Sequence, residues 1–131
     1  MRRLQIAPLV ALSLVLTTCS GQRAGSSRSE PSKVETLVSQ LPAGAEGVEL
    51  VARGLRLKKG YQFVKESDST YAIARMNGEV VGRAHCECWV GVGCIPIIDG
   101  ILTCQQFPGC IDCKMKLRFG DIETPILRFT K

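Results

Sequence analysis

Cysteine is the residue type through which this chain of 131 residues can do most chemistry. Six of its seven cysteines fall within thirty residues, His85–Lys114, and they are Cys86, Cys88, Cys94, Cys104, Cys110 and Cys113. So dense a set of sulfurs calls for covalent bridges or a metal. Three chemistries are open to it: structural disulfides, a cysteine-ligated metal site, and thiol–disulfide exchange.

Disulfides are the first interpretation, because an even set of cysteines in a small exported domain is typical of a disulfide framework. Six cysteines allow fifteen connectivities. Cys86 and Cys88 are two apart in a predicted strand, which separates their Cα atoms by about 6.6 Å. Their Cβ atoms then lie well beyond the ~3.8 Å that a disulfide needs. A Cys86–Cys88 bond is therefore excluded.

A second exclusion comes from the Asp99-Gly100 pair, which predicts a tight hairpin. A two-residue turn there would pair Ile95 with Cys104 and Cys94 with Gln105. Cys94 and Cys104 would then lie on opposite faces of the hairpin. A Cys94–Cys104 bond is disfavoured for that reason.

A metal site is the alternative. Cys110-Ile111-Asp112-Cys113 forms a Cys-x-x-Cys motif on a predicted turn that enters a strand. Together with Cys86 and Cys88 it could close a tetrahedral four-sulfur site for zinc or an iron–sulfur cluster. His85 would be a spare ligand beside it.

A thiol–disulfide oxidoreductase is the third possibility. Its Cys-x-x-Cys would open a helix, whose N-terminus lowers the pKa of the thiol. Here Pro108-Gly109 precedes the motif and an alternating strand follows, so this environment is missing. Scattered acids in predicted turns complete the inventory: Asp99, Asp112, Asp121 and Glu123. No catalytic pattern is present, and we expect no enzyme.

Aromatic side chains are few, and three of them are candidates for an exposed recognition surface: Tyr61, Phe63 and Trp89. His85 is expected on the polar face of its strand, opposite to Cys86. Neither pattern by itself defines a binding site.

The N-terminus carries an export signal. Arg2 and Arg3 precede a thirteen-residue apolar run, Leu4–Leu16, which is shorter than the ~20 residues of a membrane-spanning helix. Leu16-Thr17-Thr18-Cys19 resembles the lipobox of bacterial lipoproteins. The resemblance covers residues 1–20 and implies cleavage before Cys19, acylation of Cys19 with diacylglycerol and a further acyl chain such as palmitate, and sorting to the outer membrane through Ser20.

Three segments follow from this pattern: a signal peptide at 1–18, a small and polar flexible tether at 19–31, and a cysteine-rich domain at 32–131. Without Arg2 and Arg3 the chain has fifteen basic and twelve acidic side chains, and no basic cluster is interleaved with aromatics. Nucleic-acid binding is therefore not expected. The expected partners are the membrane, through the lipid, and an unknown envelope protein or ligand.

The fold class predicted is mainly β, a small disulfide-rich β domain with one short N-terminal amphipathic helix. Ser32 and Glu35 have the spacing of a capping box for that helix. Its apolar stripe would be Val34, Leu37, Val38 and Leu41. Strands are predicted over 48–52, 61–65, 71–76, 79–90, 95–98, 101–105, 114–119 and 126–130.

Asn77-Gly78 marks the clearest hairpin, predicted as a two-residue type I′ turn. That turn would place Met76 opposite Glu79. Further along it would place Ile73 opposite Gly82 and Tyr71 opposite Ala84.

Overall fold

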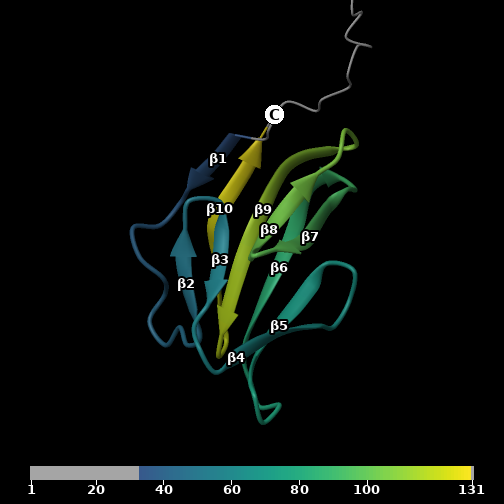
Figure 1. Ribbon diagram of the computed structural model, residues 1–131. Coiled ribbons are helices and arrows are strands. Elements are labelled where there is room, and N and C mark those ends of the chain that lie inside the picture. The colour runs from purple at the N-terminus through teal and green to yellow at the C-terminus, as the bar shows by residue number, and fades with distance from the viewer. Residues whose placement is uncertain (1–32, 131) are drawn as a thin grey trace, which may run out of the picture.

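The computed structural model describes residues 33–130, which form two antiparallel sheets packed face to face (Figure 1). The six-stranded sheet has the order β1-β10-β9-β6-β5-β4, and the four-stranded sheet has the order β2-β3-β8-β7. The strands are β1 (Lys33–Thr36), β2 (Val48–Val51), β3 (Gly54–Leu57), β4 (Tyr61–Lys65), β5 (Thr70–Arg75), β6 (Val80–Gly91), β7 (Cys94–Asp99), β8 (Ile101–Gln106), β9 (Cys110–Phe119) and β10 (Ile122–Thr130). The mainly β fold class is confirmed.

The core lies between the two sheets. The four-stranded sheet contributes the fully buried Leu55 and Leu102, and the six-stranded sheet contributes Ile73, Met115, Leu117, Leu127 and Phe129. In β9 the alternation predicted over 114–119 is observed, with Met115 and Leu117 buried and the lysines beside them facing outward. One face of the six-stranded sheet is therefore apolar and covered, whereas the other is polar.

The hairpin between β5 and β6 has a different turn from the one predicted. Arg75 N donates to Glu79 O at 2.8 Å, and Gly78 N donates to Arg75 O at 2.9 Å, so the loop has three residues, Met76–Gly78. A type I′ turn needs positive φ at both central residues. Here Gly78 has φ 92° but Asn77 does not have a positive φ. The type I′ prediction, including the Met76–Glu79 pair, is wrong.

A β-bulge nevertheless restores the predicted register further from the turn. The register shifts between Ile73, which pairs with Gly82, and Ala74, which pairs with Val80. The unpaired residue on β6 absorbs the extra residue of the loop. Ile73 therefore faces Gly82, and Tyr71 faces Ala84, as the sequence predicted.

The hairpin between β7 and β8 is shifted by one residue from the prediction. Asp99 pairs with Ile101, with Gly100 alone between them, so Ile95 faces Gln105 and Pro96 faces Cys104. A one-residue shift moves a side chain to the other face of a strand. Cys94 and Cys104 consequently share the buried face, and the prediction that they lie on opposite faces is wrong.

The predicted N-terminal helix is not formed by its described residues. Ser32 lies outside the described range, and from Lys33 the chain forms β1, which pairs with β10 from Lys33–Thr130 to Thr36–Leu127. So short a helix is marginal unless it packs, whereas the free edge of β10 offers backbone partners directly. The apolar residues Val34, Val38 and Leu41 still pack against the core.

Two short strands at the other edge of the molecule complete the fold. β2 was predicted, but β3 was not. A tight turn at Ala52-Arg53 joins these two strands. Leu55 of β3 pairs with Leu102 of β8 and closes the four-stranded sheet. Between Lys33 and Thr130 the structure contains no helix that could span a membrane.

Candidate functional site

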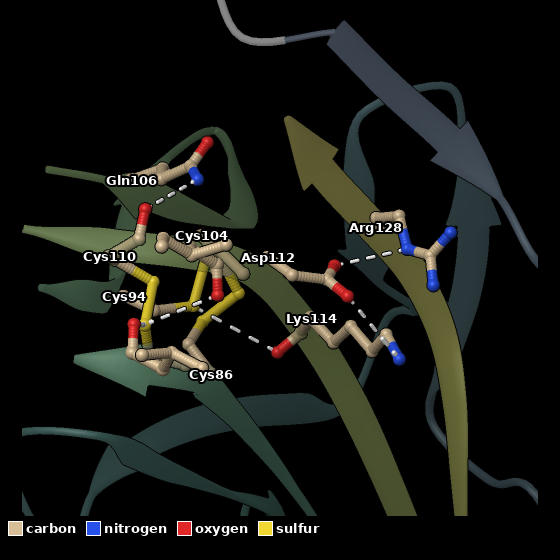
Figure 2. The surroundings of a disulfide bond; sticks show 12 residues. Cys86, Cys94, Cys104, Gln106, Cys110, Asp112, Lys114 and Arg128 are labelled. Carbon is tan, nitrogen blue, oxygen red and sulfur yellow. Dashed lines mark hydrogen bonds and ion pairs between the residues drawn. A yellow bond between two sulfur atoms is a disulfide. The ribbon is translucent and has the colours of Figure 1, made fainter. Parts of the chain in front are cut away.

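All six cysteines of the domain are bonded in three disulfides: Cys86–Cys104, Cys88–Cys110 and Cys94–Cys113. Figure 2 shows the bridges gathered where the strands of the two sheets approach one another. Cys86–Cys104 links β6 to β8, and Cys94–Cys113 links β7 to β9. Two of the three bridges therefore fasten one sheet to the other.

The third disulfide lies within the six-stranded sheet. Cys88 of β6 bonds Cys110 of β9, and Cys88 is partly exposed whereas Cys110 is buried. Neither of the pairs that the sequence argued against, Cys86–Cys88 and Cys94–Cys104, is among the bonds. The geometric reason offered against Cys94–Cys104 was wrong, because Pro96 rather than Ile95 faces Cys104, and the two cysteines share one face.

Disulfide pairing separates the four cysteines of the metal alternative. Cys88 and Cys110 bond each other, whereas Cys86 and Cys113 bond Cys104 and Cys94. The Sγ atoms of Cys86, Cys94 and Cys104 do lie within 4.8 Å of one another. They belong to two buried bridges in contact, and a disulfide sulfur lacks the thiolate charge that a metal needs from its ligands.

A ladder of ion pairs covers the outer, polar face of the six-stranded sheet. Lys116 of β9 is one centre of it: its ammonium contacts Glu87 of β6 and lies 3.6 Å from Glu123 of β10. The hydrogen bond between Lys116 and Glu87 lowers the pKa of Glu87 and raises the pKa of Lys116 from their ordinary values. His85 Nε2 lies 3.5 Å from Glu123 Oε1 and extends the ladder.

Asp112 is the second centre of the ladder. Its Oδ1 lies 3.0 Å from Arg128 Nε and its Oδ2 lies 3.7 Å from Lys114 Nζ. Figure 2 shows Asp112 between these two basic side chains. The Oδ1–Nε contact is an ion pair without an aligned hydrogen bond. Arg128 also reaches Glu35 of β1 at 3.7 Å. Asp112 has φ 61°, a left-handed conformation that few residues other than glycine adopt.

One group on this face has the composition of a metal site. His85, Glu87 and Glu123 each place a ligand atom within 4.8 Å of the other two. The ammonium of Lys116 contacts both carboxylates, so a cation already offsets part of their charge. The group serves as part of the ion-pair ladder, and His85 lies on the polar face as predicted.

Trp89 is the residue of this face that stands out for recognition. A shallow pocket of about 290 Å³ opens beside it, lined by Glu87, Cys88, Trp89, Asp112, Lys114 and Lys116. Trp89 is 76% exposed, whereas the other two aromatic candidates, Tyr61 and Phe63, are half-buried and pack against the core. The indole gives the pocket an apolar wall, and the ladder gives it paired donors and acceptors.

The pocket combines an apolar wall with paired charges. Glu87 and Asp112 are each paired with basic side chains. A wall of indole beside balanced charges suits a ligand that has an apolar face and polar groups and little net charge. No protein-family model, curated protein or solved structure matches the chain.

Sequence reasoning found the six cysteines and named Trp89, but it missed the ladder. Lys114, Lys116 and Arg128 alternate with apolar residues in β9 and β10, and that alternation was the available signal for a charged outer face. What pairs Lys116 with Glu87 and Glu123 is strand order, which the sequence alone did not show. Cys19, the predicted lipidation residue, lies outside the described residues.

Proposed function

We propose that this protein is an exported bacterial lipoprotein whose disulfide-stapled β domain serves as a binding module of the cell envelope rather than as an enzyme. The lipid on Cys19 holds the domain at a membrane, with Ser20 directing it to the outer membrane, and residues 19–31 act as a tether. The pattern Arg2-Arg3, apolar run, Leu16–Cys19 supports the anchor. Three disulfides support export, since such bonds form and persist outside the cytoplasm.

The observation that carries the binding role is the exposed Trp89 at the wall of the pocket on the outer face. The free energy of an indole is lower when a partner covers it than when water does, and tryptophans are enriched where proteins contact partners. The bridge Cys88–Cys110 and the ion pair Lys116–Glu87 hold β6, which carries Trp89, against β9. A rigid support of this kind presents a recognition residue with little loss of entropy on binding.

Paired cysteines support this role over the two alternatives. In the described part of the chain every cysteine is bonded, so a cysteine-ligated zinc or iron–sulfur site and a thiol–disulfide oxidoreductase both lack a thiolate. Cys110 and Cys113 of the Cys-x-x-Cys motif each bond a different partner. The sulfurs therefore have a structural use.

The anchor is tested by Cys19→Ser in the native host. The wild-type protein is expected in the membrane fraction with a mass that includes acyl chains, and the variant is expected without acyl chains and with residues 1–18 retained. Ser20→Asp is the matched control, since it keeps Cys19 and should keep acylation. An unacylated wild-type protein would overturn the anchor.

The binding role is tested by site-specific photo-crosslinking in intact cells. A photoreactive residue at Trp89 is expected to yield a discrete adduct with an envelope component. The same residue at Asn77, an exposed loop position at the other end of β6, is the control and should yield none. Equal labelling from both positions would contradict a recognition surface at Trp89.

A further inference from the structure

One end of the sandwich gathers strand ends from both sheets. In the six-stranded sheet, Lys33 at the start of β1 pairs with Thr130 at the end of β10, and Gly91 at the end of β6 pairs with Cys110 at the start of β9. The short loops β6–β7 and β8–β9 lie at this same end (Figure 1). The chain therefore enters the described domain at the end that these two loops form.

Four apolar side chains are exposed at this end, and we call them the apolar end: Val90, Val92, Phe107 and Ile111. Val92 is 80% exposed and Ile111 is 63% exposed. The segments that carry them, Cys88–Ile98 and Ile101–Ile111, contain no acidic or basic residue. A neighbouring group of exposed apolar residues of this kind marks an interaction surface.

Backbone contacts make the apolar end one continuous surface. Val90 and Ile111 are cross-strand partners. Phe107 N donates to Gly93 O at 2.7 Å, which ties the β8–β9 loop to the β6–β7 loop. Gly91 lies so close to Gly109 that an added Cβ would sit 2.0 Å from the carbonyl oxygen of Gly109. The two loops are thereby held together with their apolar side chains outward.

We propose that the apolar end inserts into the headgroup layer of the membrane in which Cys19 is anchored. This inference rests on the lipid anchor of the proposed function. Cys19 precedes Lys33 by fourteen residues, and a Gly/Ser-rich chain of that length spans about 20 Å on average. Because Lys33 lies at the apolar end, the anchor holds that end next to the lipid surface. Trp89, directly before Val90, has the amphipathic ring that favours the membrane interface.

The experiment uses the intact lipidated protein in vesicles of phosphatidylethanolamine and phosphatidylglycerol that contain phospholipid brominated near the headgroup end of its chains. Trp89 is the sole tryptophan of the sequence, so its fluorescence reports contact with bromine without labelling. Flotation is measured first to establish the anchor. We expect Trp89 to be quenched by the brominated lipid, and the double variant Val92→Glu/Ile111→Glu to lose that quenching while still floating.

Ile122→Glu is the matched control, because Ile122 is 70% exposed and is the first residue of β10, beside the β9–β10 turn at the opposite end of the sheet. It should leave the quenching unchanged, and intact mass should show three disulfides in every variant. A protein that does not float overturns the anchor and this inference together. A protein that floats with unquenched Trp89, or whose quenching survives Val92→Glu/Ile111→Glu, overturns this inference alone. Cross-links between two copies through Ile111, with Trp89 unquenched, would assign the apolar end to self-association instead.

Discussion

Cys88 and Cys113 are direct cross-strand partners on β6 and β9, yet they are not bonded to each other. Residues directly opposite in an antiparallel pair have Cβ atoms about 4.5–5.5 Å apart, which exceeds the ~3.8 Å of a disulfide. Each cysteine instead bonds a cysteine that is not its direct cross-strand partner. Cys88 turns to Cys110 in the same sheet, and Cys113 turns across the core to Cys94.

The first prediction concerns the state of the six sulfurs. The native protein should show no free thiol on intact-mass analysis after alkylation, a reductant should unfold it, and a chelator should not. Each bridge closes a loop of about twenty residues, for which the chain-entropy model gives roughly 3 kcal/mol. Three such terms are comparable to the whole stability of a small domain. Free thiols that appear only on removal of a metal would restore the metal site at Cys86, Cys88, Cys110 and Cys113.

The second prediction ranks the bridges. Their loops are similar in length, so loop entropy does not distinguish them. Cys86→Ala/Cys104→Ala removes buried sulfur between the two sheets, whereas Cys88→Ala/Cys110→Ala removes a partly exposed bridge within one sheet. We expect the first double variant to be the less stable, by about 1–2 kcal/mol in denaturant titration, because it also leaves a cavity in the core.

Limited reduction is a separate test of the same difference in exposure. The bridge Cys88–Cys110 should be reduced first, because a thiolate must reach a sulfur to attack it. Peptide mapping after brief alkylation identifies the cysteines that are released. Earlier release of Cys86 and Cys104 would contradict the burial on which this order depends.

A further prediction concerns the pair Glu87–Lys116. The pKa of Glu87 lies below its ordinary value of 4.5, so its stabilisation is present above pH 4.5 and is lost as the pH falls through the lowered pKa. The pKa of Lys116 lies above 10.5, so its stabilisation is present below pH 10.5 and is lost as the pH rises through the raised pKa. The pair is partly exposed and screened, and we expect a coupling of about 0.5 kcal/mol at neutral pH.

A double-mutant cycle with Glu87→Gln and Lys116→Met measures that coupling by chemical denaturation at several pH values. The coupling should be constant across the neutral range and should vanish in acid. A coupling that persists at a pH where Glu87 is protonated would show that packing, and not charge, joins the two side chains.

The last prediction compares two glycines with positive φ. Gly91 has φ 89° and Gly100 has φ 72°, so alanine at either position costs about 1–2 kcal/mol for the left-handed conformation. A Cβ at Gly100 meets no atom within 4 Å, whereas one at Gly91 lies 2.0 Å from Gly109 O. Gly91→Ala should therefore lower the melting temperature clearly more than Gly100→Ala. Equal losses would mean that the two loops of the apolar end are not held as closely as described.

Local spacing was sufficient for the features of this protein that depend on neighbours in the chain. Cys86 and Cys88 are kept apart by the rise of a strand, whatever surrounds them. The alternation around Met115 and Leu117 predicted a half-buried strand, because successive side chains point to opposite faces. Six cysteines in thirty residues predicted a disulfide framework, and that is what the domain has.

Tertiary structure decided what depends on distant partners. Val34 and its neighbours have helical spacing, but the open edge of β10 supplied backbone hydrogen bonds that a short helix could not match. The one-residue loop at Gly100 places Cys94 and Cys104 on the same face. The packing of β7 and β8 against β6 and β9 then determines that Cys94 bonds Cys113 and that Cys104 bonds Cys86. Sequence spacing determines which way a side chain points along its own strand, whereas only the assembled sheets determine which side chain it meets.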